Sequence, residues 1–275
     1  MKYKSVKFNF INPESFKHRR ANESDCSIFI NESTTITLKD ETSPCLIYIK
    51  DVDVTGLVEA CSKVYIPTNV RGRGLVTTSR TFGYAPRNLV RNLGCRNSSL
   101  NVDSPVEHDA IVKCADKASF HYKRYAPVVA KKHQFMTDNY LDPEYKLGES
   151  MFTSGVINKD NPLLYHYDKG NYTGVWSAMF AFKKDVEGGY LAIPELDVTL
   201  ETSDNSLTLF NGQLYLHGVT PVRKKNKNAY RYTVVYYSLK DMWNCEPYKG
   251  EVEYLRQKRT YTEQKKAERG NRVDR

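Results

Sequence analysis

The 275-residue chain lacks the features of membrane and secreted proteins. No segment approaches the roughly 18 consecutive apolar residues that a membrane-spanning helix requires. Met1-Lys2-Tyr3-Lys4 is not followed by the apolar segment of a signal peptide. Repeats and low-complexity runs are also absent. We therefore expect a cytoplasmic protein, long enough to bury a core, with no membrane contact and no obligate protein partner.

Cysteine pairs at metal-binding spacing are missing as well. The six cysteines are Cys26, Cys45, Cys61, Cys95, Cys114 and Cys245. None of them forms a C-x-x-C motif, which excludes a zinc knuckle, and they are too dispersed for a dense disulfide framework. The simpler interpretation is a set of buried thiols in a reducing compartment.

Lysine is absent between Val64 and Val112, although the whole chain carries a net charge of +9. In that stretch, 26 consecutive positions without Asp or Glu contain the arginines Arg71, Arg73, Arg80, Arg87, Arg91 and Arg96. Arginine without lysine indicates planar, bidentate contacts to phosphate, to a base edge or to a carboxylate. The positive surplus favours a polyanionic partner, most often nucleic acid, although many soluble proteins carry such a surplus for solubility alone.

Residues 1–149 combine short strand patterns with helical segments. We expect a short helix at Val54–Val64 and an ordered, turn-rich loop at Arg71–Ser99. Val112 to about Thr137 is helical in period, but Pro127 must end or kink that helix. Residues 243–275 form a charged tail, with nine Lys or Arg against five acids from Lys249 onward. This tail is either a solvated helix or a mobile basic arm.

Short strands dominate residues 150–242. The expected strands are Met151–Ile157, Leu163–Asp168, Thr173–Phe182, Gly189–Ile193, Thr199–Thr202, Ser206–Phe210, Gln213–His217 and Tyr230–Leu239. Their regular spacing and intervening turn residues are typical of an all-β barrel or sandwich such as a jelly roll. We therefore expect a mainly β, α+β fold in one domain. A double-stranded β-helix forms its core, with flanking N-terminal helices and the charged C-terminal helix or arm.

His166-Tyr167-Asp168 is the motif with the most specific chemistry. On a strand, His166 and Asp168 share one face and can present two ligands to the same point. His217, on a later strand pattern, completes a set of two imidazoles and one carboxylate, which suits non-haem Fe(II) with open positions for oxygen chemistry. The alternative is a core histidine followed by a turn aspartate.

Arg231 lies on the last strand pattern, where Arg231, Thr233 and Val235 share a face. A fixed guanidinium there can bind a carboxylate bidentately. Together with the three metal-binding candidates, this arrangement indicates an oxygenase that uses Fe(II), O2 and 2-oxoglutarate.

Five short motifs in the C-terminal half occur in the order found in the TET/JBP dioxygenases, which oxidise the 5-methyl group of pyrimidines in DNA. They are His166-x-Asp168-x-x-Asn171, Gly188-Gly189-Tyr190-Leu191, Leu209-Phe210-Asn211-Gly212, His217-Gly218-Val219-Thr220-Pro221-Val222 and Arg231-x-Thr233-Val234-Val235-Tyr236-Tyr237. The chain resembles this family well from about Phe152 to Met242, and less surely at Arg80–Arg87. It is most similar to small phage-encoded and other microbial members, because it lacks the large insertions and the cysteine-rich region of the animal enzymes.

The resemblance implies a single catalytic domain in which His166, Asp168 and His217 hold Fe(II). It also implies that Arg231 and Thr233 bind the distal carboxylate of 2-oxoglutarate. In this family the position three residues after the metal aspartate touches the target base. That position is Asn171 here, although its place after Lys169-Gly170 is also explained by turn chemistry.

The implied substrate is methylated, double-stranded DNA, with Arg80 and Arg87 as further contacts. The target nucleotide must be flipped out of the helix, because a methyl group within a duplex cannot reach a buried metal. An Asn can serve either pyrimidine edge, so 5-methylcytosine is favoured only weakly over thymine. The basic residues of the Val222–Asn228 loop are either phosphate contacts or a solvated hairpin tip. If the gene is carried by a phage, the expected location is the cytoplasm of the host.

Three alternatives stay open. An oxygenase acting on a protein side chain or a small molecule would keep the iron-binding residues and Arg231 without needing DNA. A non-catalytic, cupin-like binding module would show no oxygen uptake. A DNA-binding protein with an accidental His-Asp-His set would bind DNA regardless of iron.

Overall fold

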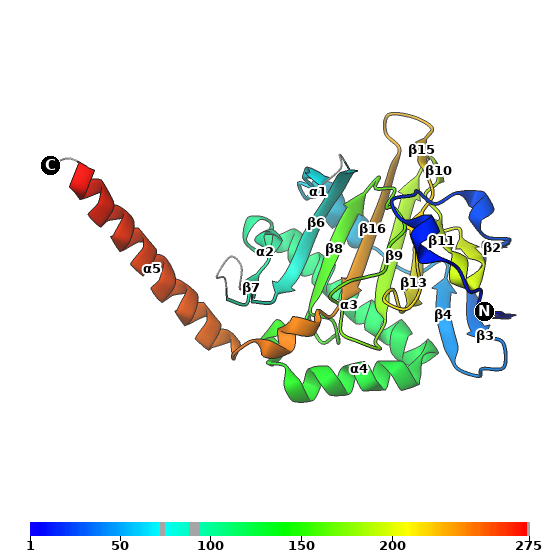
Figure 1. Ribbon diagram of the computed structural model, residues 1–275, viewed down its shortest axis with the longest axis horizontal. Helices are drawn as coiled ribbons and strands as arrows, with labels where there is room; N and C mark the ends of the chain where they lie inside the picture. Colours follow the sequence, from blue (N-terminus) through cyan, green and yellow to red (C-terminus); the bar gives the residue numbers. More distant parts are fainter. Residues whose placement is uncertain (72–74, 88–93, 274–275) are drawn as a thin grey trace.

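The computed structural model describes residues 1–71, 75–87 and 94–273 (Figure 1). A large β-sheet and a smaller one pack against each other, and their apolar side chains interlock between them. Helices cover the opposite face of the large sheet. The expected mainly β fold with flanking helices is confirmed.

Strands from both halves of the sequence build the large sheet. In spatial order they are β1 (Lys2–Val6), β3 (Thr34–Leu38), β4 (Pro44–Ile49), β13 (Ser206–Phe210), β9 (Ser177–Lys184), β16 (Tyr230–Tyr237), β8 (Ser154–Lys159), β6 (Leu75–Ala85) and β5 (Thr68–Arg71), with β7 (Arg96–Asn97) paired to β6. The pairing is antiparallel except between β1 and β3. The N-terminal strands β1, β3 and β4 therefore extend the sheet that contains Arg231.

The smaller sheet closes over one part of the large sheet. Its strands, in spatial order, are β14 (Gly218–Val219), β11 (Leu191–Ile193), β12 (Val198–Leu200) and β2 (Ile28–Ile30). A separate ribbon is formed by β10 (Val186–Gly188) and β15 (Val222–Lys224). Both sheets thus contain strands from residues 1–50.

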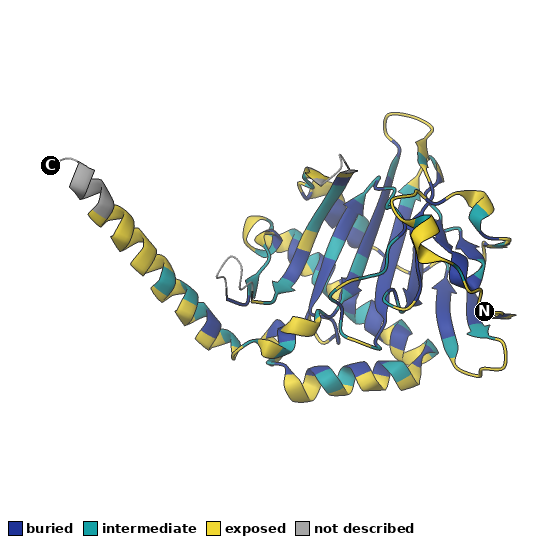
Figure 2. Cartoon of the chain, in the orientation of Figure 1, coloured by how far each residue is buried: buried dark blue, intermediate teal, exposed yellow. Residues whose placement is uncertain are grey.

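Alternation along β16 divides the large sheet into two environments. Tyr232, Val234 and Tyr236 are buried in the core beneath the helices. Arg231 and Thr233, on the opposite face, line a cavity between the sheets. Successive side chains of a strand point to opposite faces, so one strand serves both the core and the cavity. The buried colouring of the central strands in Figure 2 reflects this double coverage.

The helices are α1 (Leu57–Lys63), α2 (Ser99–Asp103), α3 (Pro105–Tyr125), α4 (Pro127–Tyr140) and α5 (Tyr248–Val273). Short 3-10 helices are η1 (Pro13–Phe16), η2 (Glu23–Asp25), η4 (Pro143–Tyr145), η5 (Pro194–Leu196) and η6 (Lys240–Asn244). Pro127 starts α4 directly after α3 ends. Proline has no N–H to donate, and the first helical position needs none, so the predicted break at this residue is confirmed.

The expectation of an ordered loop at Arg71–Ser99 is wrong for Leu75–Ala85, which forms β6. This strand pairs with β5 on one side and β8 on the other. Gly83 is not a turn residue: a Cβ there would lie 2.7 Å from the Thr153 carbonyl oxygen, so glycine permits the close approach of β8. The glycines and arginines concealed the alternation of Thr77, Ser79 and Thr81, which is typical of a strand.

The expectation of reduced thiols is wrong for two cysteines. Cys95 and Cys245 form a disulfide, with Cα atoms 5.9 Å apart. The partners are separated by 150 residues, so no local spacing could reveal the pair. Cys26, Cys45, Cys61 and Cys114 are buried and free, as expected. None of the described helices has the length and apolar character needed to cross a membrane.

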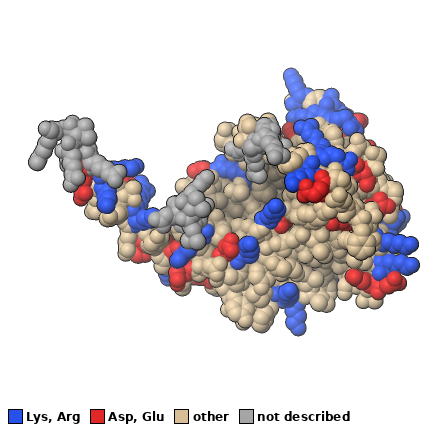
Figure 3. Space-filling view, in the orientation of Figure 1, with Lys and Arg blue, Asp and Glu red and all other residues tan. Residues whose placement is uncertain are grey.

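The tail is a helix rather than an irregular arm. Helix α5 extends away from the body of the molecule to the C-terminal end of the described chain (Figure 1). Lysine and arginine side chains are visible in Figure 3 on the part of this helix that is not drawn in grey. Of the two possibilities that the charge pattern left open, the structure has the solvated helix.

Candidate active site

His166, Asp168 and His217 converge on one point. Their candidate ligand atoms all lie within 4.8 Å of one another. The Nε2 atoms of His166 and His217 are 3.8 Å and 3.7 Å from Asp168 Oδ1, respectively. The structure therefore brings together the three residues that the sequence selected as a metal-binding set.

The local structure around these residues differs from the prediction. Neither Leu163–Asp168 nor Gln213–His217 is a regular strand; an isolated antiparallel bridge joins His166 to His217 instead. Each of the two residues donates its backbone N–H to the other's carbonyl at 3.0 Å. Asp168 N–H donates to the Gly212 carbonyl at 2.8 Å. Tertiary pairing, rather than strand propensity, thus fixes the separation of the ligands.

Backbone carbonyls set the tautomer of both imidazoles. His166 Nδ1 lies 2.8 Å from the Leu164 carbonyl, and His217 Nδ1 lies 2.9 Å from the Tyr215 carbonyl. A carbonyl can only accept, so each Nδ1 carries a proton, and Nε2, the ring nitrogen near Asp168, is the candidate metal ligand. Burial, together with a smaller effect of the nearby His166, lowers the pKa of His217 to about 4, and Asp168 opposes the shift. The imidazole of His217 is therefore neutral near pH 7, as a metal ligand must be.

The residues around the three ligands fit a metal ion held from one side. A Cβ at Gly212 would lie 2.2 Å from Asp168 Oδ2, so glycine at this position lets the carboxylate stay against the backbone. Two imidazoles and one carboxylate, all from one side, form the donor set of the non-haem Fe(II) oxygenases and leave coordination positions open. The donor chemistry therefore suits Fe(II).

Arg231 is a buried cation beside this site. Its residue is 1% exposed, and among the described residues its Nε and Nη2 atoms have no hydrogen-bond partner. Burial lowers its pKa to about 10, a shift that nearby Asp160 opposes, so the guanidinium stays charged near neutral pH. An uncompensated buried charge is costly. A carboxylate entering the cavity would supply the missing hydrogen bonds and charge.

Gly189 shapes the place where Arg231 lies. It has a φ of +68°, and a Cβ there would lie 2.5 Å from both Cδ and Nε of Arg231. Glycine is favoured at this φ and is the residue that lets the backbone approach the guanidinium so closely. Gly189 therefore packs directly against the cation, whereas Gly188 lies against the Pro221 carbonyl.

A cavity of about 300 Å³ contains both the metal-binding candidates and Arg231. Its polar lining residues are Thr77, Ser79, Thr81, Asn158, Asn161, His166, Asp168, Lys169, Asn171, Ser177, His217, Arg231 and Thr233. Apolar side chains that include Met179, Leu191, Phe210 and Val219 complete the lining. The volume and mixed lining are typical of a small-molecule site.

Asn158 and Asn161 are site residues that the sequence prediction missed. Both are buried; Asn161 donates to Asn158 at 3.2 Å, and Asn158 donates to Thr233 Oγ1 at 3.3 Å. Since Thr233 Oγ1 accepts this bond, its own hydroxyl proton is available to an acceptor in the cavity. The sequence did contain a signal for them: Asn158 directly follows the strand-like run Gly155-Val156-Ile157, and Asn161 comes three residues later.

Asn171 lies in the cavity but contacts the metal-binding set. Its Nδ2 atom donates to Asp168 Oδ2 at 3.3 Å and to Ser177 Oγ at 3.2 Å. Such a bond orients a metal-binding carboxylate. Gly170 has a φ of +101° and lies at a bend of the chain just before Asn171. Contact between Asn171 and a base stays a prediction.

Arg80 and Arg87 are not brought to the cavity. Arg80 pairs with Asp103 and donates to the Tyr65 carbonyl at 2.9 Å, while its neighbours Ser79 and Thr81 line the cavity. Arg87 pairs with Glu251 of α5 at 2.6 Å. Their expected contact with a substrate in the cavity has no support in this arrangement. Arg73 and Arg91, and the side chain of Arg71, lie outside the described part of the chain.

The basic segment that begins in β15 and continues into the following hairpin is largely neutralised. Arg223 pairs with Glu23 at 3.2 Å, Lys224 with Asp160 at 3.0 Å and Lys225 with Glu187 at 3.1 Å. Exposed pairs contribute little to stability, but they reduce the positive field of the hairpin. The solvated hairpin tip is the interpretation that this structure favours.

Comparisons with known proteins agree with this geometry. Residues 81–240 match the model of the Tet/JBP family, described as the oxygenase domain of the 2OGFeDO superfamily. The chain is 28% identical over 116 residues to the bifunctional helicase and thymine dioxygenase JBP2 of Trypanosoma brucei brucei (strain 927/4 GUTat10.1). That match covers 42% of this chain and only 10% of the relative.

A solved structure shares the fold. It is NgTET1 in complex with 5mC DNA, with a TM-score of 0.58 and 12% identity. The match covers 89% of this chain and 94% of that one. The predicted jelly-roll architecture is confirmed by this likeness, and at such identity the likeness concerns the fold alone.

Proposed function

Because this chain belongs to the Tet/JBP family of 2-oxoglutarate- and Fe(II)-dependent oxygenases, we propose that it hydroxylates the 5-methyl group of a pyrimidine in DNA. The target nucleotide would be flipped out of a methylated double strand, with 5-methylcytosine favoured over thymine. NgTET1, whose fold this chain shares, was solved with 5mC DNA, and JBP2 is a thymine dioxygenase, so the relatives support either base. The net charge of +9 suits a polyanionic substrate.

The observation that supports the proposal most strongly is the buried, unpartnered guanidinium of Arg231 in the same cavity as the His166–Asp168–His217 set. A metal site alone needs no buried cation, and a carboxylate-binding site alone needs no imidazoles. A cosubstrate with a chelating end and a distal carboxylate needs both. 2-Oxoglutarate has this chemistry.

Each residue then has a defined task. His166, Asp168 and His217 would hold Fe(II), and Arg231 with the Thr233 hydroxyl would bind the distal carboxylate of 2-oxoglutarate. Ferrous iron, 2-oxoglutarate and O2 together supply the power to hydroxylate a methyl C–H bond, with release of succinate and CO2. Asn171 would hold Asp168 in place and face the target base.

The protein's remaining contribution is orientation and exclusion of water. Met179, Leu191 and Phe210 supply apolar walls to the cavity. The hydroxyl-bearing residues of β6, Ser79 and Thr81, line it from the edge of the large sheet. A flipped base costs a few kcal/mol of lost stacking and pairing, which hydrogen bonds and packing in such a pocket would offset.

The test is mass spectrometry of nucleosides from DNA incubated with the protein, Fe(II), ascorbate and 2-oxoglutarate. Duplexes containing 5-methylcytosine, and duplexes with thymine as the methylated base, are compared. We expect the 5-hydroxymethyl product from the wild-type protein. Asp168→Ala should abolish it while leaving DNA binding almost intact, because the substitution removes a ligand from the metal but no positive charge. Asp109→Ala, which removes an exposed carboxylate of α3, is the matched control.

Two results would contradict the proposal. Product formation by the Asp168→Ala variant would show that the three residues do not hold the metal. Succinate production without oxidised DNA would favour an oxygenase of proteins or small molecules. One observation favours this second function, an oxygenase of proteins or small molecules: Arg80 and Arg87 pair with carboxylates of this chain rather than facing the cavity.

A further inference from the structure

Glu195 is a buried acid on the side of the metal-binding segments that faces away from the cavity. It lies in η5 and is only 5% exposed. In the part of the chain that the structure describes, its carboxylate contacts hydrogen-bond donors and forms no ion pair. A glutamate is seldom buried this far without a cation beside it, because moving a carboxylate out of water costs free energy. Packing alone therefore does not explain the acid at this position.

The two oxygens of Glu195 contact the two segments that contain the metal-binding candidates. The Tyr167 hydroxyl donates to Oε1 at 2.6 Å, and the Leu216 backbone N–H donates to Oε2. Tyr167 lies between the first two metal-binding candidates in the sequence, and Leu216 directly precedes His217. A single carboxylate therefore joins both segments.

This link lies next to the backbone bridge between the segments. His166 and His217 exchange two backbone hydrogen bonds of 3.0 Å. In an antiparallel pair the next opposed residues, here Tyr167 and Leu216, exchange none. Tyr167 packs in the apolar cluster that contains Leu216, whereas His166 lines the cavity. Glu195 thus joins the segments where the backbone does not, behind the metal-binding side chains.

Elements outside the two segments fix the position of Glu195. Its own backbone carbonyl accepts the Asn9 N–H at 2.8 Å, and the Pro194 carbonyl accepts from Asn9 Nδ2 at 3.3 Å. The preceding strand, β11, pairs with β14, which begins directly after His217. The smaller sheet and the N-terminal segment therefore hold the carboxylate in place, and a fixed acceptor determines where its two donors lie.

We propose that Glu195 is a positioning residue for the metal site, which keeps the three metal-binding candidates at the separation that one ion requires. It acts through the Tyr167 hydroxyl and the Leu216 N–H. This inference rests on the proposed function, because it takes the three candidates as the ligands of Fe(II). Removing a group that orients metal ligands typically weakens metal affinity by about 10- to 100-fold. Glu195 contacts residues adjacent to the ligands rather than the ligands themselves, so the lower part of this range is expected for the loss of one contact.

The experiment measures the affinity of the full-length protein for Co(II), which is stable in air and absorbs visible light according to its coordination. Tyr167→Phe removes only the hydroxyl that donates to Glu195. Tyr236→Phe is the matched control, because it removes a buried hydroxyl that donates to the Ile111 carbonyl at 2.7 Å on the helix-covered face of β16. Urea denaturation of the metal-free proteins compares the stability that each variant loses.

We expect Tyr167→Phe to bind Co(II) about tenfold more weakly than wild type. Tyr236→Phe should stay within a factor of about two, because it lies away from the metal-binding segments. Glu195→Ala should bind about 10- to 100-fold more weakly and change the visible spectrum of bound Co(II), because it also leaves the Leu216 N–H without an acceptor. Glu195→Gln should return to within about threefold of wild type, since its amide oxygen can accept from Leu216 and its NH2 can donate to Tyr167 Oη.

Equal Co(II) affinity in Tyr167→Phe and Tyr236→Phe would overturn the inference, because the contact with Glu195 would then have no effect beyond general stability. A Glu195→Gln variant as weak as Glu195→Ala would overturn it as well, since charge rather than the two hydrogen bonds would be responsible. Should Glu195→Ala fail to fold, the comparison of the two tyrosine variants decides.

The proposed function fails separately from this inference. If wild type oxidises DNA but Tyr167→Phe binds Co(II) as tightly as wild type does, only the inference is lost. If the Co(II) affinities follow the expected order but wild type with Fe(II) oxidises no DNA, only the proposed function is lost.

Discussion

The two faces of strand β16 have opposite character. Towards the helices, Tyr232, Val234 and Tyr236 are packed in an apolar core, and the Tyr236 hydroxyl donates to the Ile111 carbonyl at 2.7 Å. Towards the cavity, Arg231 is buried with two unpartnered nitrogens. One face satisfies its groups within the chain, whereas the other leaves them for a ligand. Stability and binding are therefore assigned to alternate residues of a single strand.

The cavity face of β16 lowers the stability of the fold, because its buried cation has no partner within the chain. A buried cation without a counterion destabilises the fold by several kcal/mol even after the surrounding structure relaxes. The helix-covered face compensates through apolar burial, at about 25 cal/mol for each Å² removed from water. Substitutions on the cavity face should consequently alter ligand affinity with little loss of stability, and those on the core face should do the reverse.

Arg231→Ala should show the largest difference between its effect on ligand affinity and its effect on stability. Loss of the guanidinium removes the charge-assisted bonds to 2-oxoglutarate, so affinity should fall by about 2–5 kcal/mol, which is 30-fold or more. The free energy of unfolding should fall little, or even rise, because a lone buried charge is removed. Isothermal titration calorimetry with 2-oxoglutarate and urea denaturation measure the two effects. Arg223→Ala, at the exposed hairpin, serves as the control; a similar loss there would point to a general charge effect.

Val234→Ala tests the opposite face of the same strand. Val234 is fully buried beneath the helices, so truncation should reduce the free energy of unfolding by about 2 kcal/mol. Affinity for 2-oxoglutarate should stay within a factor of two or so of wild type, because no cavity atom is removed. Val128→Ala, on the exposed side of α4, should change stability by less than about 0.5 kcal/mol. A large loss of 2-oxoglutarate affinity in Val234→Ala would mean that the faces are not independent.

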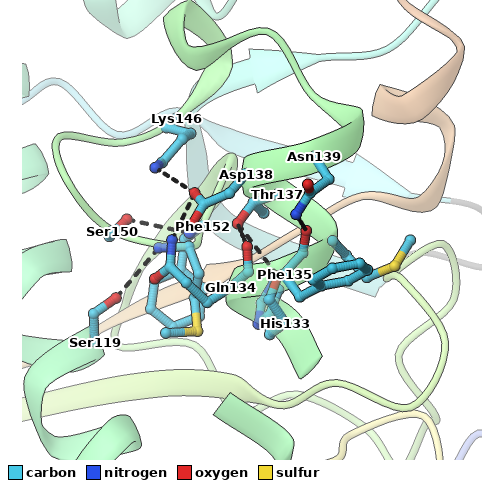
Figure 4. Close-up of polar contacts among 12 residues, drawn as sticks. Ser119, His133, Gln134, Phe135, Thr137, Asp138, Asn139, Lys146, Ser150 and Phe152 are labelled. Atoms are coloured by element: carbon cyan, nitrogen blue, oxygen red, sulfur yellow. Dashed lines mark hydrogen bonds and ion pairs between the residues drawn. The ribbon is translucent and has the colours of Figure 1, made fainter. Parts of the chain in front are cut away.

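His133, in the helix-covered core, makes the stability of the fold depend on pH. Figure 4 shows it on α4 beside Phe152; it is fully buried, and its Nε2 lies 2.8 Å from the Ser238 hydroxyl. Burial lowers its pKa to about 3. The folded pKa is below the unfolded value of about 6.5, so the unfolded chain binds more protons between these limits. The contribution of the neutral His133 imidazole to the free energy of unfolding is therefore complete above about pH 6.5 and is lost as pH falls towards 3.

The expected slope is at most about 1.4 kcal/mol per pH unit in this window. The free energy of unfolding of wild type should fall between pH 6.5 and 4, and His133→Asn should reduce the slope of that fall by up to about 1.4 kcal/mol per pH unit. Urea denaturation at several pH values measures both slopes. Ser238→Ala keeps the buried imidazole and should retain the slope. An identical pH profile for wild type and His133→Asn would show that the imidazole does not titrate on unfolding.

The sequence predicted chemistry better than local structure. The spacing of His166 and Asp168, and the positions of His217 and Arg231, selected residues that the fold places in one cavity. The strands expected around His166 and His217 are instead irregular segments joined by one bridge. That pairing is a tertiary contact across 51 positions, and hydrophobic alternation within a short window contains no information about it.

Other differences have similar physical causes. Strand β6 was missed because Gly83, Pro86 and the flanking glycines were interpreted as turn residues, although its Val, Thr, Phe and Tyr residues favour a strand and it pairs with β8. Asn158 and Asn161 were missed because an asparagine in sequence indicates a turn, whereas here a buried relay with Thr233 satisfies both amides. Arg80 and Arg87 were expected to contact substrate, but their carboxylate partners are 23 and 164 positions away. The single-domain organisation stays a prediction, as does the cytoplasmic location.

The link between Cys95 and Cys245 closes the intervening polypeptide into a ring. That ring contains His166, Asp168, His217 and Arg231, together with β8, β9 and β16. A protease that cuts one peptide bond between the two half-cystines leaves both fragments joined through sulfur. Release of a fragment requires either a second cut or a reductant, so the oxygenase core resists separation after a single nick.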